Sequence, residues 1–250
     1  MKKLLPPVAL LVGLIALWEL VVRAADIPDY LFPAPSAVAA ALRDDSGVLW
    51  DATLVTAREM LLGYLLAVAA GLGLAVALHF STVLRRALLP LLVLSQTVPT
   101  VVLAPVLAIL LGYGIGPKLV VVAIVCFFPI VVNAVDGLRA TDPELMRMMK
   151  TLRGTRWSIF RRVEFPGALP IIFSGARIAA TYAAVGAVFG EWAGSSEGLG
   201  FVMLQSQPSL DTELIFASVL ILSLLALALY GAVTLLERLL VPWKFEPAHA

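Results

Sequence analysis

The chain has 250 residues, of which 61% are hydrophobic and only 14% are charged, and its mean hydropathy is +0.98. Globular domains are about 45–50% apolar and about 25% charged, so this composition excludes an ordinary soluble domain and indicates an integral membrane protein. The formal net charge of +1 gives no sign of a nucleic-acid partner. We therefore expect residues 1–250 to form a single membrane domain in contact with lipid.

Six apolar runs are long enough to span a bilayer, which takes about 20 mostly apolar residues. They are continuous, whereas membrane barrel strands alternate between apolar and polar positions, so they predict an all-α bundle of about six transmembrane helices. The first run resembles a signal peptide, but Trp18 and Glu19 interrupt it, and we interpret it as a spanning helix. The expected spans are residues 4–22, 60–80, 87–111, 119–135, 171–189 and 214–236.

The segments before the second span and after the fifth are polar. Ser36 follows two prolines and is expected to cap a short helix over residues 37–42, outside the membrane. The carboxylates near these segments, among them Glu59, Glu191 and Glu197, are interpreted as solvated surface.

Small residues within the spans indicate packing. Gly186 and Gly190 have the G-x-x-x-G spacing of close helix packing, which we place at a dimer seam. Cys126 is the only cysteine and lies in an apolar run, so we interpret it as a small buried hydrophobe.

Lys and Arg are distributed unevenly along the chain. With the N-terminus in the cytoplasm, fourteen of the 18 basic residues fall on the cytoplasmic side, and the other four are Arg23, Arg43, Arg58 and Lys118. Basic residues favour the cytoplasmic side of short loops. We therefore predict that both termini are cytoplasmic.

The connection between the fourth and fifth spans, about residues 138–170, is the one long cytoplasmic segment. It is polar, strongly basic and helical in pattern. Asp142 is expected to cap a helix that has Pro143 at its first position and runs to about Leu152. The sequence then predicts a turn and a second helix over residues 156–165.

Two roles fit this hairpin. A basic amphipathic hairpin can lie on the anionic inner leaflet of a membrane. An apolar helix face can instead insert into a groove of a partner protein. The second role is favoured by large apolar side chains gathered within two turns, namely Leu145, Met146, Met148, Met149 and Leu152.

Several motifs resemble one family. Residues 142–157 and 160–170 resemble the EAA loop of bacterial ABC importer permeases, whose pattern is Glu-Ala-Ala, three residues, Gly, nine residues and Ile-x-Leu-Pro. Residues 95–99, 128–133 and 190–200 resemble the nitrate, sulfonate, taurine and pyrimidine-precursor branch. This resemblance covers nearly the whole chain and implies the type I, MetI-like permease fold with a cytoplasmic coupling hairpin.

By this resemblance the chain is a permease subunit of an ATP-driven ABC importer in a bacterial cytoplasmic (inner) membrane. It contains no G-x-x-x-x-G-K-[ST] phosphate loop. ATP and Mg are therefore expected on a separate ATPase, and the chain itself is expected to hold no cofactor or metal and to be no enzyme. The implied partners are a second copy of the permease, two ATPase subunits and an extracytoplasmic substrate-binding protein that delivers a small solute.

The hairpin departs from the family pattern. Aligned through Pro166, the family's Glu-Ala-Ala falls on residues 147–149 and its Gly falls on Arg153, and Gly154 is expected to supply the backbone freedom for the turn. The side chains expected to enter a groove on the ATPase are Met148, Met149 and Leu152. The basic side chains expected to meet acidic groups on the rim of that groove are Arg147, Lys150, Arg153 and Arg156. The residues expected to couple to the ATPase are Glu144, Arg147, Met148, Met149, Lys150, Leu152, Arg153, Gly154, Arg156 and Pro166.

Polar groups within spans are costly, so they mark either a pathway or a hydrogen bond between helices. Three of them lie beside Pro99, where the missing backbone N–H frees carbonyls to line a cavity. The expected translocation path is Gln96, Thr97, Thr100, Asn133 and Tyr182.

The substrate and the class of protein each have alternatives. Residues 179–182 and 190–200 look most like permeases for thiamine-precursor pyrimidines of the hydroxymethylpyrimidine type, with riboflavin, sulfonates, taurine and nitrate as alternatives. A membrane-embedded enzyme would need paired carboxylates or a His-containing cluster near one bilayer face, which the spans lack. A passive channel would leave the basic hairpin unexplained.

Overall fold

The computed structural model describes residues 5–244. Within this range the chain is helical almost throughout and contains no β-strand, which confirms the all-α prediction. Lys2, Lys3 and the start of the first expected span at Leu4 lie outside the described residues. The α-helices are α1 (Leu5–Ala24), α2 (Pro35–Asp44), α3 (Ser46–Phe80), α4 (Thr82–Ser95), α5 (Thr100–Leu111), α6 (Ile115–Arg139), α7 (Pro143–Thr151), α8 (Arg156–Ile159), α9 (Phe165–Trp192), α10 (Leu199–Ser206) and α11 (Thr212–Leu240).

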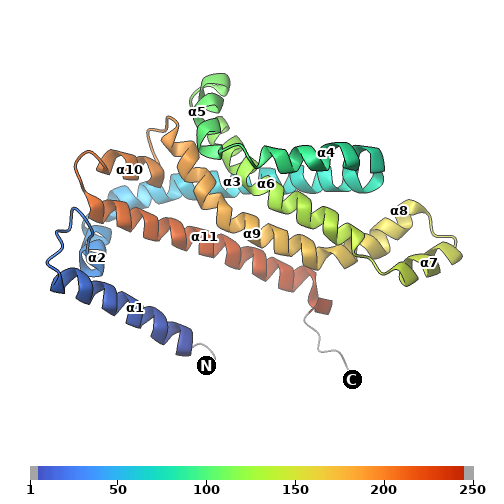
Figure 1. The fold of residues 1–250 in the computed structure, drawn as a ribbon, viewed down its shortest axis with the longest axis horizontal. Coiled ribbons are helices and arrows are strands. Elements are labelled where there is room, and N and C mark those ends of the chain that lie inside the picture. The colour runs from blue at the N-terminus through green and yellow to red at the C-terminus, as the bar shows by residue number, and fades with distance from the viewer. Residues whose placement is uncertain (1–4, 245–250) are drawn as a thin grey trace.

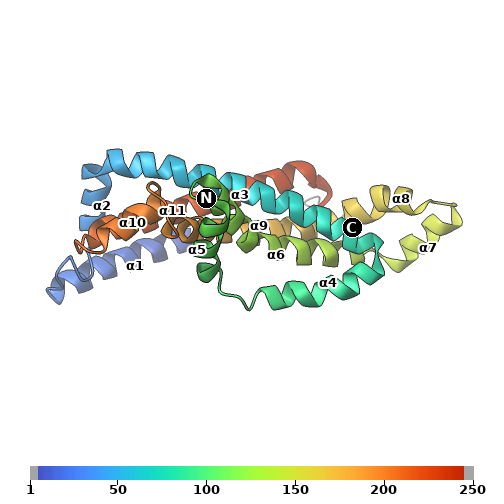
Figure 2. The same ribbon diagram turned by 90° about the horizontal axis from the view of Figure 1, so that it is seen from above.

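The long helices run along the longest axis of the molecule (Figures 1 and 2). Five of them are long and apolar enough to cross a bilayer, and the bent pair α4 and α5 makes a sixth if it is counted as one span. The prediction of about six spans is therefore confirmed. The five continuous candidates are Pro6–Ala24, Ser46–Phe80, Ile115–Arg139, Arg156–Trp192 and Thr212–Leu240.

The third expected span, residues 87–111, is not one straight helix, so the prediction is wrong in its geometry. α4 and α5 meet at a bend of 101°, and α5 projects away from the bundle (Figure 1). Gln96 and Thr97 donate backbone hydrogen bonds to carbonyls three residues back, which tightens the last turn of α4. Pro99 then has no backbone N–H to continue the ladder, and the chain starts a new helix in another direction.

The second hairpin helix is joined to the fifth span. The sequence predicts a helix that ends before Pro166, but the helical path continues without a break from Arg156 to Trp192, so that prediction is wrong. Phe160–Glu164 form a π-helical turn that ends two residues before Pro166. The proline lacks the N–H that an α-helical bond would need, and the wider turn accommodates it inside a continuous helix. Movement of the hairpin is therefore connected to α9 without an intervening loop.

α2 begins earlier than predicted. It starts at Pro35 with Ala34 at its N-cap, so the prediction that Ser36 caps it is wrong. Instead, the carboxylate of Glu19 in α1 accepts hydrogen bonds from the Ser36 N–H (3.0 Å) and hydroxyl (2.8 Å) and pairs with Arg23. A carboxylate is favoured at a helix N-terminus, and this one fastens α1 to α2.

α6 is packed between α3 and α9. A Cβ atom on Gly63 of α3 would lie 2.5 Å from Cβ of Val122, and one on Gly186 of α9 would lie 2.8 Å from Cα of Val122. A Cβ on Gly190 would lie 3.1 Å from Cα of Lys118, also in α6. The close packing predicted for these two glycines of α9 is confirmed, but it lies within one chain and not at a dimer seam.

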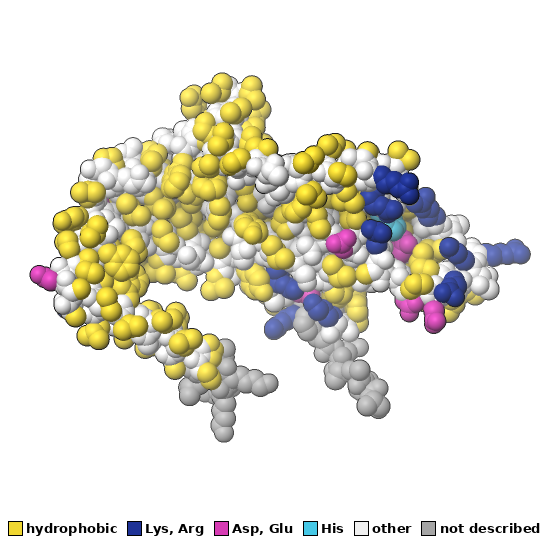
Figure 3. All heavy atoms as spheres, viewed as in Figure 1, with side chains coloured by type: hydrophobic (Ala, Val, Ile, Leu, Met, Phe, Trp, Pro, Cys, Tyr) yellow, Lys and Arg dark blue, Asp and Glu magenta, His cyan; other side chains and the backbone are white. Residues whose placement is uncertain are grey.

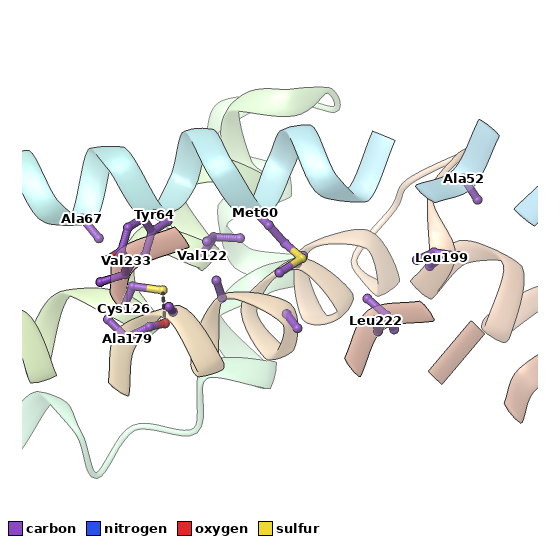
Figure 4. Close-up of a cluster of buried hydrophobic side chains, with 14 of the residues drawn as sticks. Ala52, Met60, Tyr64, Ala67, Val122, Cys126, Ala179, Leu199, Leu222 and Val233 are labelled. Carbon is purple, nitrogen blue, oxygen red and sulfur yellow. Dashed lines mark hydrogen bonds between the residues drawn. The ribbon is translucent and has the colours of Figure 1, made fainter. Parts of the chain in front are cut away.

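Buried hydrophobic side chains of α3, α6 and α9 form one core cluster with residues of α10 and α11 (Figure 4). Cys126 is fully buried, and its Sγ lies 3.3 Å from the carbonyl oxygen of Ala179. The hydroxyl of Tyr64 donates to the carbonyl of Ala176 at 3.1 Å. Cys126 is thus a small buried hydrophobe, as predicted, and the polar atoms of this core find partners inside the protein.

Candidate functional site

The first helix of the hairpin begins as the sequence predicts. Asp142 is the N-cap of α7, and its Oδ1 accepts a hydrogen bond from the N–H of Glu144 at 2.7 Å. Pro143 occupies the first helical position, where a missing N–H costs nothing. These two residues fix where α7 starts relative to α6.

The end of α7 differs from the expectation. The N–H of Arg153 donates to the carbonyl of Lys150 (3.0 Å), and the N–H of Gly154 donates to the carbonyl of Met149 (2.9 Å), the hydrogen-bond pattern of a Schellman motif. The left-handed residue of this motif is Arg153, with φ of 54°. The prediction that Gly154 supplies the backbone freedom is wrong, because Arg153 is the residue with the left-handed conformation. Arg153 is also the position at which the family pattern has its glycine.

Gly154 is needed for a different reason. A Cβ atom at this position would lie 2.9 Å from the carbonyl oxygen of Met149 and 3.2 Å from Cγ1 of Ile159. Cβ atoms in proteins essentially never lie within 3.0 Å of such an atom. The two arms of the hairpin therefore meet here only because residue 154 has no side chain.

Replacing Arg153 with glycine should stabilise the turn by about 1 kcal/mol, because an L-residue with a side chain pays roughly that amount in the left-handed region. Amide hydrogen exchange of the Gly154 N–H in the intact permease should slow by about fivefold. The matched control is Arg147→Gly in α7. It should speed exchange of the same Gly154 N–H, since glycine in a helix interior costs about 1 kcal/mol and weakens the helix that the turn closes. Faster exchange in Arg153→Gly would contradict the assignment.

One face of α7 is an exposed apolar stripe, which we define as Leu145, Met148 and Leu152. These side chains are 38%, 52% and 69% exposed, and their spacing of three and four residues places them on one side of the helix. Met149, expected on the same face, is half-buried. Basic side chains gather at this end of the molecule (Figure 3), and Glu144, Arg147 and Lys150 are exposed beside the stripe.

The base of the hairpin is fastened to the end of α3. The guanidinium of Arg156 donates to the carbonyl of Phe80 at 2.8 Å and lies 5.0 Å from the centre of its ring. His79 Nε2 lies 2.9 Å from Oε2 of Glu164 in the π-helical turn. Arg156 is therefore engaged within the chain, whereas we expected it at the rim of a groove on the partner.

A cavity of about 620 Å³ lies at the break between α4 and α5, against α6 and α9. It brings together four of the five residues expected on the translocation path, Gln96, Thr100, Asn133 and Tyr182. Thr97 does not line it, and its hydroxyl donates to the carbonyl of Leu94 at 2.8 Å. The remaining lining residues are Val93, Ser95, Val98, Pro99, Ile124, Val125, Phe128, Pro129, Val132, Ile178 and Val185.

The chemistry of this cavity is neutral. Its lining contains no Lys, Arg, Asp, Glu or His among the described residues. Two amides, Gln96 and Asn133, and the hydroxyls of Thr100 and Tyr182 are the main polar groups, and Phe128 and Tyr182 supply aromatic rings. The apolar members Ile178 and Val185 were missed by sequence reasoning, because one apolar residue on a spanning helix looks like any other until its neighbours are known.

A second cluster lies at the end of the bundle opposite the hairpin, and it corrects the interpretation of two carboxylates as solvated surface. Glu59 and Glu191 are 2% and 1% exposed. Lys118 Nζ donates to Oε1 of Glu59 and to Oγ of Ser195, both at 2.6 Å. The cluster joins α3, α6 and α9. Glu197 is exposed as predicted, and no group of three or more His, Cys, Asp or Glu within residues 5–244 is placed to hold a metal ion.

Together these features define an all-helical, multi-pass membrane protein with a neutral cavity at a broken helix and a basic hairpin presenting an apolar face. Residues 67–245 match the family described as binding-protein-dependent transport system inner membrane component. The chain belongs to this family, and it is thus a permease component of an ABC importer in the inner membrane.

Curated relatives are similar over nearly their whole length. A probable ABC transporter permease protein of Haemophilus influenzae is 38% identical over 231 residues, which cover 92% of this chain and 94% of the relative. The formylaminopyrimidine transport permease protein ThiX of Halalkalibacterium halodurans is 35% identical over 241 residues, 96% of each chain. The riboflavin transport system permease protein RibX of Chloroflexus aurantiacus is 37% identical over 240 residues, 95% of this chain and 89% of the relative.

Proposed function

We propose that this permease carries a small neutral pyrimidine of the thiamine-precursor type through the cavity at the α4–α5 break. The observation that supports this substrate class is the absence of charge in the described lining of the cavity. A sulfonate or nitrate ion would lose its hydration there without meeting an opposite charge. A neutral heterocycle can stack on Phe128 or Tyr182 and hydrogen-bond to Gln96 and Asn133.

The names of the relatives support a heterocyclic substrate and also suggest a second candidate substrate. The permease named for formylaminopyrimidine aligns over 96% of both chains, and the permease named for riboflavin has a similar identity. Both names denote neutral aromatic heterocycles. The permeases named for aliphatic sulfonates and for taurine are more distant, at 28% and 26% identity. Riboflavin is therefore the second candidate.

The test uses the substrate-binding protein that pairs with this permease. Its melting temperature should rise by about 5 °C or more with formylaminopyrimidine or hydroxymethylpyrimidine at about 100 times the dissociation constant. Riboflavin, taurine and nitrate serve as comparison ligands under the same conditions. A shift with riboflavin alone would replace the proposed substrate, and a shift with taurine or nitrate alone would refute the argument from the neutral cavity.

The importer would be driven by polypeptides other than this one. Two copies of the permease would pair in the membrane, two ATPase subunits carrying ATP and Mg would dock on the hairpins, and an extracytoplasmic binding protein would deliver the solute. The apolar stripe of Leu145, Met148 and Leu152 would enter a groove on the ATPase. The continuous path from Arg156 into α9 would carry the movement toward the cavity.

The orientation follows from the same scheme. The basic hairpin would face the ATPase in the cytoplasm, and the bias of Lys and Arg toward the hairpin end fits this placement. Both termini would then be cytoplasmic, and the Glu59 cluster would lie at the outer end of the bundle.

A further inference from the structure

The cluster opposite the hairpin contains one more negative charge than positive charges if both of its carboxyl groups are ionised. Glu59 and Glu191 are almost completely buried, and Lys118, 7% exposed, is the only buried basic residue among the described ones. A buried charge without a partner costs several kcal/mol. The cluster therefore needs one more positive charge. The hydrogen bonds of the two carboxyl groups indicate which of them would accept it.

Glu191 behaves as the ionised member. Its Oε1 accepts from the hydroxyl of Thr56 at 2.6 Å, and its Oε2 accepts from the N–H groups of Gly200 at 2.5 Å and Phe201 at 3.3 Å. The Thr56 oxygen itself accepts from the N–H of Leu199 at 2.9 Å, so the hydroxyl hydrogen is free to point at Glu191. A carboxyl that accepts from three donors is best satisfied as a carboxylate.

Glu59 has one oxygen satisfied and one orphaned. Lys118 donates to Oε1, and the fully buried Oε2 has no hydrogen-bond donor. Thr56, which donates to Glu191 at 2.6 Å, precedes Glu59 by three residues on the same face of α3, so the Glu59 and Glu191 carboxyl groups are neighbours in the cluster. Two neighbouring buried carboxylates would repel, whereas a proton on Oε2 of Glu59 would remove one charge and supply a donor.

We propose that Glu59 and Glu191 form a binding site for a single proton, carried on Oε2 of Glu59 and donated to Glu191. The bound proton makes the cluster neutral, with Lys118 balancing Glu191, and gives every buried oxygen of the pair a partner. It joins α3 to α9 at the point where Glu191 also holds the N-terminus of α10. This inference does not depend on the proposed substrate.

The surroundings give the proton a route to water. A cavity of about 570 Å³ lies beside the cluster and is lined by Arg58, Glu59, Lys118 and Glu197 among others. Arg58 and Glu197 are the other charged groups that face it from α3 and from the loop before α10, and they offset each other. Proton exchange can therefore occur through this cavity without α3 and α9 first separating over their length.

The test compares two isosteric variants of the full-length permease, purified with its ATPase partner in lipid nanodiscs. Glu59→Gln imitates a protonated Glu59, since its amide N–H₂ can donate to Glu191 and its carbonyl can accept from Lys118. We expect a melting temperature within about 2 °C of the wild type. In Glu191→Gln the proton leaves Glu59, which then becomes the counter-charge of Lys118. The carboxylate that accepts from Thr56, Gly200 and Phe201 is replaced by an amide with a single acceptor oxygen, and we expect a fall of roughly 6 °C or more. Glu197→Gln, at an exposed residue lining the same cavity, should change nothing.

Infrared spectroscopy reads the proton directly. The wild type should show a carbonyl band of a protonated carboxyl that shifts in D₂O and is missing from Glu59→Gln. This measurement holds even if Glu191→Gln fails to fold. Absence of the band, or a loss of stability in Glu59→Gln as large as in Glu191→Gln, would overturn the proposal. A melting temperature that rises with sodium or potassium at constant ionic strength would also overturn it, in favour of a metal cation between the two carboxylates.

Discussion

Replacing Gly154 with valine is expected to reduce transport by tenfold to about a hundredfold while the partner ATPase continues to hydrolyse ATP. The valine Cβ would meet the carbonyl oxygen of Met149 at 2.9 Å and Cγ1 of Ile159 at 3.2 Å. Overpacking of this kind costs about 1–3 kcal/mol, and each 1.4 kcal/mol corresponds to about a tenfold change. The hairpin should open at its base, so that ATPase movement no longer reaches α9. Substrate uptake and ATP hydrolysis are measured together in proteoliposomes.

The control for this variant is Gly167→Val. Gly167 lies in the first turns of α9, is exposed, and has nothing within 4 Å of the position its Cβ would take. The number of ATP molecules hydrolysed per solute transported should therefore stay near the wild-type value in Gly167→Val and rise in Gly154→Val. If Gly154→Val forms an intact complex and hydrolyses the wild-type number of ATP molecules per solute transported, the hairpin is not the coupling element.

Replacing Gln96 with tryptophan is expected to abolish at least nine-tenths of transport. Gln96 lines the cavity of about 620 Å³ at the break between α4 and α5, and the indole would occupy space that the solute needs and remove an amide that can bind it. Ligand cavities in proteins typically have about 300–1,000 Å³, so one added ring system takes a substantial part of the free volume. Initial uptake rates of the labelled solute in proteoliposomes provide the measurement.

The neighbouring residue provides the matched control. Thr97 is exposed like Gln96, belongs to the same irregular segment, and does not line the cavity. Thr97→Trp should keep at least half of the wild-type uptake. Equal loss of transport in both variants, or normal uptake by Gln96→Trp, would show that the solute does not pass through this cavity.

The hairpin shows how local signals transfer to structure. The Asp142 cap and Pro143 at the first helical position are formed by neighbours in the chain, so the sequence places the start of α7 correctly. The turn after α7 is also local, but two adjacent residues compete for the left-handed position. A glycine is usually assigned to it, whereas here Arg153 takes it because Gly154 has to pass next to Met149 and Ile159.

The broken span shows the limit of composition. Residues 87–111 are apolar enough for one helix, and hydropathy counts side chains without regard to hydrogen bonds. Pro99 identifies the place where the ladder fails, yet proline also occurs inside spanning helices that remain continuous, as Pro129 does in α6. Only the packing of α4 against α3 and of α5 against α6 and α9 decides that one proline redirects the chain by 101° and the other does not.

The amino-acid sequence by itself determines the membrane location, the helical fold, the approximate spans, the hairpin and the family, because each of these depends on hydropathy or on short motifs. The tertiary structure decides which polar residues share a site. It gathers Gln96, Thr100 and Asn133 around a neutral cavity and brings Glu191 to Thr56, three residues before Glu59 in α3, across 135 positions of the chain. Burial of a charge and the identity of its partner are properties of packing between distant segments, and no local pattern in the sequence records them.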